Sequence, residues 1–230
     1  DVHGIGLTGQ QANVTSTLAL WPGSIGGFWG HREDLAGIRA FALRLMPPSL
    51  LGGALGAWLM LITPQKLFDQ LVPWLILTAS VLLAANDPVN KLLKKIHGHE
   101  RTPGWWIAAI CFQFVVGLYG GFFGAGIGIL MLAALSLLGL TDIHQMNGLK
   151  NLLALCINGV AIFAFLAMEA LRHPGYVKWG YMVPMAVAAG LGGLFGSHMA
   201  HRVGRGPVRI GVISIGFVLS AWYFYKTYGA

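Results

Sequence analysis

One lysine near the start of a long apolar segment carries the chemistry that the sequence points to most directly. Lys150 follows the polar run from Asp142 to Gln145 and lies near the start of the apolar segment 145–170. A lysine at the centre of a membrane span costs roughly 2.5–3.5 kcal/mol to insert. It can extend its ammonium group to the lipid headgroups, or it can face a polar cavity and hold an anion. No acidic residue lies in the middle of an apolar segment, so Lys150 has no obvious buried partner, which favours an anion from outside the chain.

Hydroxyl and amide side chains lie near the start of an earlier apolar segment. Asn13, Thr15, Ser16 and Thr17 can donate hydrogen bonds to oxyanion oxygens. The glycine-rich run Gly120–Gly128, which includes Gly124 and Gly126, can present backbone N–H groups, because glycine lets the backbone approach a ligand closely. Helix N-termini add partial positive charge. Each feature also has an ordinary explanation: the hydroxyls bond to helix backbone, and the glycines only allow close helix packing.

The composition places these residues in a membrane. Hydrophobic residues make up 56% of the 230 residues and charged residues 10%, whereas soluble domains carry about 25% charged residues. The net charge of +7 is carried by short loops between apolar segments, which is the pattern that orients membrane proteins. We therefore expect an all-α protein that crosses the lipid bilayer several times and does not bind nucleic acid.

The lengths of the apolar segments predict the crossings, since about 20 residues span the hydrocarbon core as a helix. The predicted spans are 13–30, 41–62, 67–86, 145–170, 176–200 and 207–228. The stretch 104–139 is too long for one crossing and too short for two. We expect it to form a re-entrant hairpin of two helices of about 15 residues, broken at Tyr119–Gly121 and at the glycines that follow. Such a hairpin is tolerated where its broken backbone is buried in protein or lines a wet cavity.

Loop charges give the orientation. The loops near 31–44, 87–103 and 201–209 hold ten of the fifteen Lys and Arg residues. If 104–139 is a hairpin, these loops share one side, and the positive-inside rule makes that side cytoplasmic. A single crossing of 104–139 gives the same count of ten against four, so only the length of the stretch favours the hairpin.

The chain contains an internal repeat. Gln10 and Leu18–Leu20 match Gln145 and Leu153–Leu155 at an offset of 135, which places Thr15 and Ser16 on Lys150 and Asn151. A second match, at an offset of 140, pairs Gly52–Ala57 with Gly192–Ser197. Internal duplication with a site at the repeat interface is common in secondary transporters. We expect one membrane domain of two inverted repeats, 1–95 and 96–230, with the hairpin of the first repeat lying upstream of residue 1.

Three segments resemble the signatures of one known family. These are Gln11–Ser24, the glycine-rich Gly120–Gly128 and Met146–Leu155, which contains Asn147, Lys150 and Asn151. In this order they resemble the sulfite exporter family TauE/SafE, and the resemblance runs over the whole chain. It implies transport of a small sulfur-containing anion, such as sulfite, sulfoacetate or another organosulfonate, across the bacterial inner membrane. The absence of a first glycine-rich hairpin is the one departure.

Other functions have less support. No catalytic arrangement of Ser, His and Asp, phosphate-binding loop or paired carboxylates occurs in a fitting context, so we expect a transporter without a cofactor. His198 and His201 have no nearby cysteine or acidic residue to complete a metal site. A membrane-embedded enzyme and a non-transporting membrane subunit stay open as alternatives. The sequence leaves open whether the chain forms a homodimer.

Overall fold

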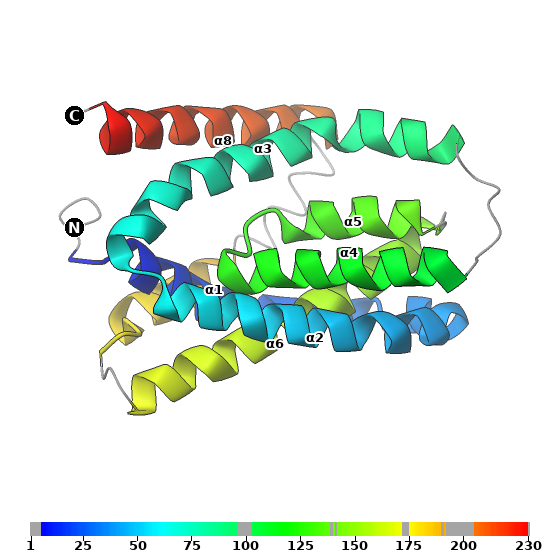
Figure 1. Cartoon of the computed structure of the whole chain (residues 1–230), viewed down its shortest axis with the longest axis horizontal. Coiled ribbons are helices and arrows are strands. Elements are labelled where there is room, and N and C mark those ends of the chain that lie inside the picture. The colour runs from blue at the N-terminus through cyan, green and yellow to red at the C-terminus, as the bar shows by residue number, and fades with distance from the viewer. Residues whose placement is uncertain are drawn as a thin grey trace.

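The computed structural model describes residues 6–95, 103–138, 140, 142–171, 175–189, 191 and 205–229. Across these residues the chain is helical and contains no strand, as the composition predicts. The helices are α1 (Gly9–Gly30), the 3-10 helix η1 (Glu33–Ile38), α2 (Arg39–Ile62), α3 (Gln65–Lys95), α4 (Pro103–Phe122), α5 (Ile127–Leu137), α6 (Ile143–Leu171), a short helix Trp179–Ala189 and α8 (Arg205–Tyr228). The long helices lie roughly along one axis (Figure 1).

Five helical segments within the described residues are long and apolar enough to cross a membrane. They are Arg39–Ile62, Gln65–Ala85, Gly104–Phe122, Ile143–Leu171 and Ile210–Tyr228. Four of them match predicted spans. Helix α1 has 22 residues but is not one of the five, because glycine and polar residues interrupt its apolar sequence. Of the predicted span 176–200, the structure describes the short helix Trp179–Ala189, and most of the remainder lies outside the described residues.

The stretch 104–139 is broken, as predicted, but the break lies later than expected. Helix α4 runs for 20 residues through Gly120 and Gly121, and α5 has 11 residues. The turn between them uses Gly124 and Gly126, which both have φ of +76°. This left-handed conformation favours glycine. The prediction of two equal helices was therefore wrong, because Gly120 and Gly121 pack inside a helix rather than making the turn.

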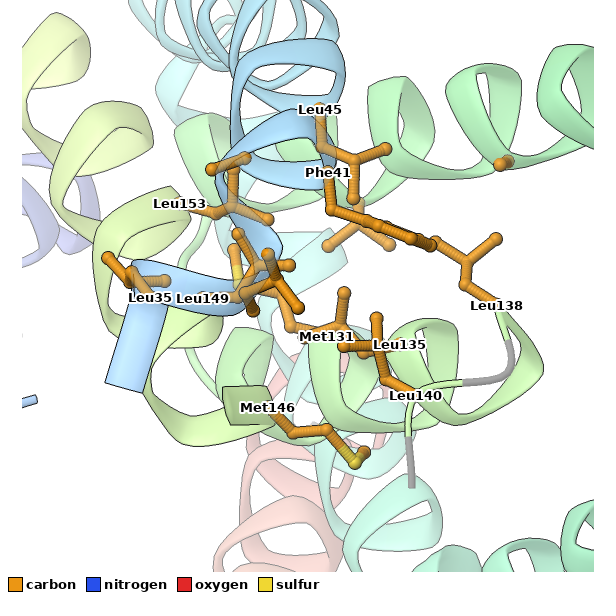
Figure 2. Close-up of a cluster of buried hydrophobic side chains, with 14 of the residues drawn as sticks. Leu35, Phe41, Leu45, Met131, Leu135, Leu138, Leu140, Met146, Leu149 and Leu153 are labelled. Atoms are coloured by element: carbon orange, nitrogen blue, oxygen red, sulfur yellow. The ribbon is translucent and has the colours of Figure 1, made fainter. Parts of the chain in front are cut away.

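Both outer ends of this stretch lie at the same end of the molecule. Helices α4 and α5 lie side by side and run in opposite directions (Figure 1). The ring of Trp106, near the start of α4, packs at a tilt against that of Phe41. Leu138 and Leu140, just beyond α5, belong to the same buried cluster as Phe41 (Figure 2). The segment thus enters and leaves at one end, which is the geometry of a hairpin.

Helices α2 and α4 approach so closely that backbone meets backbone. A Cβ atom placed on Gly52 would overlap the carbonyl oxygen of Phe114, and one on Gly121 would overlap that of Gly53. Both helices carry the G-x-x-x-G spacing, at Gly52–Gly56 and Gly117–Gly121, which is common where membrane helices pack tightly. The partner segment of the glycine repeat, Gly192–Ser197, lies outside the described residues.

Two buried clusters hold the two ends of the bundle. One joins η1 and the starts of α2 and α6 to α5, and the other joins α1, the end of α2 and the second half of α6. Many large apolar side chains elsewhere are exposed, including Leu51, Trp58, Ile107 and Phe163. In a protein that spans a bilayer, this surface faces lipid.

Candidate functional site

A cavity of about 1060 Å³ opens at the end of the molecule where α1 begins. The start of α1, the first half of α3, the turn after α4 and the end of α8 form its walls. Side chains from distant parts of the sequence meet there: Asn13, Ser16, Thr17, Lys66, Asp69, Gly124, Asn158 and Lys226. Apolar residues such as Leu20, Phe68, Val72 and Phe123 complete the wall. The cavity is therefore mostly apolar with a few polar groups, which is typical of small-molecule sites.

The α1 side chains in this cavity are held by local hydrogen bonds. The hydroxyls of Ser16 and Thr17 both donate to the carbonyl oxygen of Asn13, at 2.9 and 2.8 Å. Each hydroxyl oxygen can still accept a hydrogen bond, but its single O–H group already donates to Asn13. The Asn13 amide donates to the carbonyl oxygen of Phe122 at 3.2 Å and so ties α1 to the glycine turn. In this conformation the hydroxyls bond to the helix backbone, which is their ordinary role in a membrane helix. The Asn13 amide has a second hydrogen that the bond to Phe122 does not use.

Thr15 and Gly126, which the sequence places in the same site, lie outside the cavity. Thr15 is 1% exposed and accepts a hydrogen bond from the backbone N–H of Lys178 at 3.3 Å. Gly126 packs on α3, where a Cβ atom would lie 3.0 Å from the Ala79 methyl group. Gly124 does line the cavity. Of the glycine turn, only its first half therefore reaches the space where a ligand would bind.

The charge at the cavity comes from residues that the sequence indicated only as orientation signals. Lys66 and Lys226 both line it. The one lining carboxylate, Asp69, accepts a hydrogen bond from the Gln65 amide at 2.6 Å. Two cations against one anion leave a net positive lining. The two lysines lie at opposite ends of the chain, so nothing in their local sequence indicates that they share a cavity.

The polar residues of the cavity form one polar group, and a second polar group lies at the start of α6. The Lys150 ammonium donates to the Asn147 side-chain oxygen at 3.2 Å, and Lys150 is half-buried. The Asn151 amide donates to the carbonyl oxygen of Gly27 at 3.1 Å. Gly128 of α5 faces the lysine stem, since a Cβ atom there would lie 3.5 Å from the lysine Cδ. No carboxylate of the described residues lies within 4.0 Å of the Lys150 ammonium. Its charge is therefore uncompensated in the part of the chain that the structure describes.

The two polar groups lie at opposite ends of the bundle. Helices α1 and α6 run antiparallel, and Asn151 bonds to Gly27 near the end of α1. Asn13 lies 14 positions before Gly27, which corresponds to about 21 Å along a helix. The structure thus places the starts of α1 and α6 at opposite ends of the bundle, because helices that run in opposite directions start at opposite ends.

The three segments that resemble family signatures contribute to the cavity, to the polar group around Lys150 and to the turn between α4 and α5. A comparison with known families matches residues 2–223 to the sulfite exporter TauE/SafE family. The chain belongs to the sulfite exporter TauE/SafE family. No curated protein and no solved structure matches it.

Membership of the TauE/SafE family gives the chain a general role. It is a multi-pass membrane protein of a family that transports sulfur-containing anions such as sulfite. The family is one of transporters rather than enzymes. The net positive cavity and the uncompensated Lys150 agree with an anionic substrate.

Proposed function

We propose that this TauE/SafE protein is a secondary transporter that exports a small sulfur-containing anion, such as sulfite, sulfoacetate or another organosulfonate, across the bacterial inner membrane. The observation that carries this proposal is Lys150. It is half-buried in a membrane helix and hydrogen-bonded only to a neutral side chain among the described residues. A charge in that position is costly unless it serves a ligand. An anion that reaches Lys150 would supply the missing negative charge.

Alternating access is supported by the way the two halves pair. Asn151 and Leu155 of α6 bond to Gly27 and Trp21 of α1, so the two helices cross in opposite directions. In an inverted repeat with an offset of 135, a two-fold axis relates each residue of α1 to the residue 135 positions later in α6. For this antiparallel pair the axis passes near residues 21 and 156, close to the hydrogen bond between Trp21 and Leu155. Such a crossing is what an inverted repeat requires.

A second helix pair supports the same arrangement. Ser220 of α8 donates to the carbonyl oxygen of Pro73 in α3, and a Cβ atom on Gly216 would meet Ser80. These contacts are also antiparallel. With an offset of 140, the same two-fold axis would pass near residues 78 and 218, which lie between the two contacts. The two polar groups then correspond to each other, one in each half.

The direction of transport follows from electrostatics. The three loops with most Lys and Arg residues mark the cytoplasmic side by the positive-inside rule. A membrane potential that is negative inside favours the exit of an anion by about 2.3 kcal/mol per charge per 100 mV. Export therefore needs no coupling ion in principle.

The test is flux of labelled sulfite, sulfoacetate and thiosulfate in proteoliposomes. We expect one of these anions to leave faster than from protein-free liposomes. Lys150→Ala should remove most of that flux, whereas Lys150→Arg, which keeps the charge, should retain part of it. Lys178→Ala is the matched control, because this lysine belongs to neither polar group. If no anion moves, or if Lys150→Ala transports normally, the proposal fails. Chemical conversion of the anion would instead indicate a membrane-embedded enzyme.

A further inference from the structure

An arginine on the lipid-facing side of α2 lies outside both polar groups. Arg44 is exposed and shares its helix face with the exposed side chains of Leu51, Leu55 and Trp58. This face otherwise presents apolar groups to the surroundings. A charged side chain here points to the lipid rather than to the interior of the bundle.

The depth of Arg44 places it at a membrane surface. Helix α2 ends at Ile62, 18 positions after Arg44. At 1.5 Å per residue this is about 27 Å, close to the ~30 Å thickness of the hydrocarbon core. When the end of α2 is at one boundary, Arg44 is therefore close to the other, and its long side chain can reach the lipid phosphates. That boundary belongs to the end that carries most of the Lys and Arg residues.

The guanidinium group of Arg44 lies over an aromatic ring. The Arg44 Cζ atom lies 4.4 Å from the centre of the Trp106 ring. Phe41 packs on the same ring at 5.0 Å, and Trp105 meets it edge-on at 5.1 Å. A cation over the face of tryptophan is attracted to it. The stacked guanidinium still has its N–H groups at its edges, where they can bind the oxygens of a phosphate.

No acidic side chain of the described residues pairs with Arg44. The one ion pair within 4.0 Å in the described part of the chain joins Arg32 to Glu33. Asp34 lies against Gly148 of α6, and Asp142 caps the start of that helix by accepting from the His144 N–H at 2.8 Å. Among the described residues, Arg44 therefore has no acidic partner. Arg39, which is also exposed and unpaired, adds a second positive charge at this end of α2.

We propose that Arg44, stacked on Trp106 and assisted by Arg39, binds the phosphate of an anionic phospholipid headgroup at the Lys- and Arg-rich surface of the membrane. The acyl chains would lie along the exposed apolar side chains of α2 and α4, among them Leu51 and Ile107. Basic residues at this depth attract anionic lipids. The site is separate from the transported anion, and its test does not depend on transport.

The test measures lipids retained by the purified full chain. The protein is titrated with phosphatidylglycerol or with phosphatidylcholine of the same acyl chains, and bound lipids are counted by native mass spectrometry. We expect phosphatidylglycerol to be retained in preference. Arg44→Ala should weaken this retention about fivefold, as expected for the loss of one cation at the surface. Arg32→Ala, which removes an exposed arginine that already pairs with Glu33, is the matched control and should lower retention much less.

Two further measurements separate the contributions of charge, of the planar guanidinium and of the acyl chains to lipid retention. Arg44→Lys keeps the charge but loses the planar stacked group, and we expect it to be intermediate. Glycerol phosphate, which has the headgroup chemistry without acyl chains, should not compete at concentrations at which the lipid is retained. Equal retention of both lipids, or an equal loss in Arg44→Ala and Arg32→Ala, would overturn the proposal.

Discussion

At the scale of residues, the contact between α2 and α4 depends on glycines that leave no room for a side chain. Gly121→Ala would place a methyl group against the carbonyl oxygen of Gly53, and neither backbone can move without separating the helices. We expect this substitution to lower the free energy of unfolding by about 1–3 kcal/mol, the usual cost of overpacking. Thermal unfolding of the purified protein in detergent measures the effect.

Gly104→Ala is the control for this prediction. Gly104 lies in the same helix, but a Cβ atom there would meet nothing within 4 Å. It should leave the midpoint of unfolding unchanged or raise it slightly, because alanine favours a helix. Equal destabilisation by the two substitutions would show that the G-x-x-x-G contact is not the reason that glycine occupies position 121.

At the scale of elements, the hairpin fixes the side on which each loop lies. Helix α8 packs antiparallel to α3, so its last residues lie beside the start of α3, near the connection between α2 and α3, and its first residues point away from that connection (Figure 1). In a chain without Cys111 and Cys156, single cysteines at positions 33 and 205 should therefore react with an impermeant maleimide from the same side of the membrane. A cysteine at position 66 should react from the opposite side.

This labelling distinguishes the two topologies that loop charge alone cannot separate. If 104–139 crossed the membrane once, position 205 would be labelled together with position 66. That pattern would overturn the hairpin. Intact cells and inverted membrane vesicles give the two sides, and the cysteine at position 33 serves as the internal reference in both.

The sequence predicts most of these elements, but not the details that depend on their neighbours. Apolar length places α2, α3, α6 and α8, because crossing a bilayer is a local property of each segment. The glycine run predicts a break, yet which glycines turn depends on neighbouring helices. Gly121 packs against Gly53 of α2, and Gly120 packs against Ile127 of α5 and Ile157 of α6, so both stay helical. Local reasoning also singles out Lys150 as a candidate site residue. It does not predict that Lys66 and Lys226 line one cavity, because only the folded chain brings α3 and α8 together.

At the scale of the whole molecule, each half of the proposed repeat would hold the first helix of the other half through a loop. At one end, the Tyr176 hydroxyl donates to the Gln10 side-chain oxygen at 3.2 Å, and the Lys178 N–H donates to Thr15. At the other end, a Cβ atom on Gly37 would lie 3.3 Å from the Gln145 amide nitrogen. Gln10 and Gln145 are matched positions of the repeat. In the alternating-access mechanism proposed above, these two loop contacts would close opposite ends of the transport path.

Alternating access predicts that both loop contacts must open during each cycle. A disulfide between cysteines at positions 34 and 148 would lock one end, since a Cβ atom on Gly148 would lie 3.3 Å from that of Asp34, close to the Cβ separation of disulfides. Cysteines at positions 15 and 178 would lock the other end. In chains without Cys111 and Cys156, we expect either disulfide to stop anion flux in proteoliposomes and a reducing agent to restore it. The reduced form of each variant is its own control, and each single-cysteine variant reports the cost of the substitution alone. Full flux with both ends cross-linked would mean that these loops do not move during transport, and the path would then have to run elsewhere in the bundle.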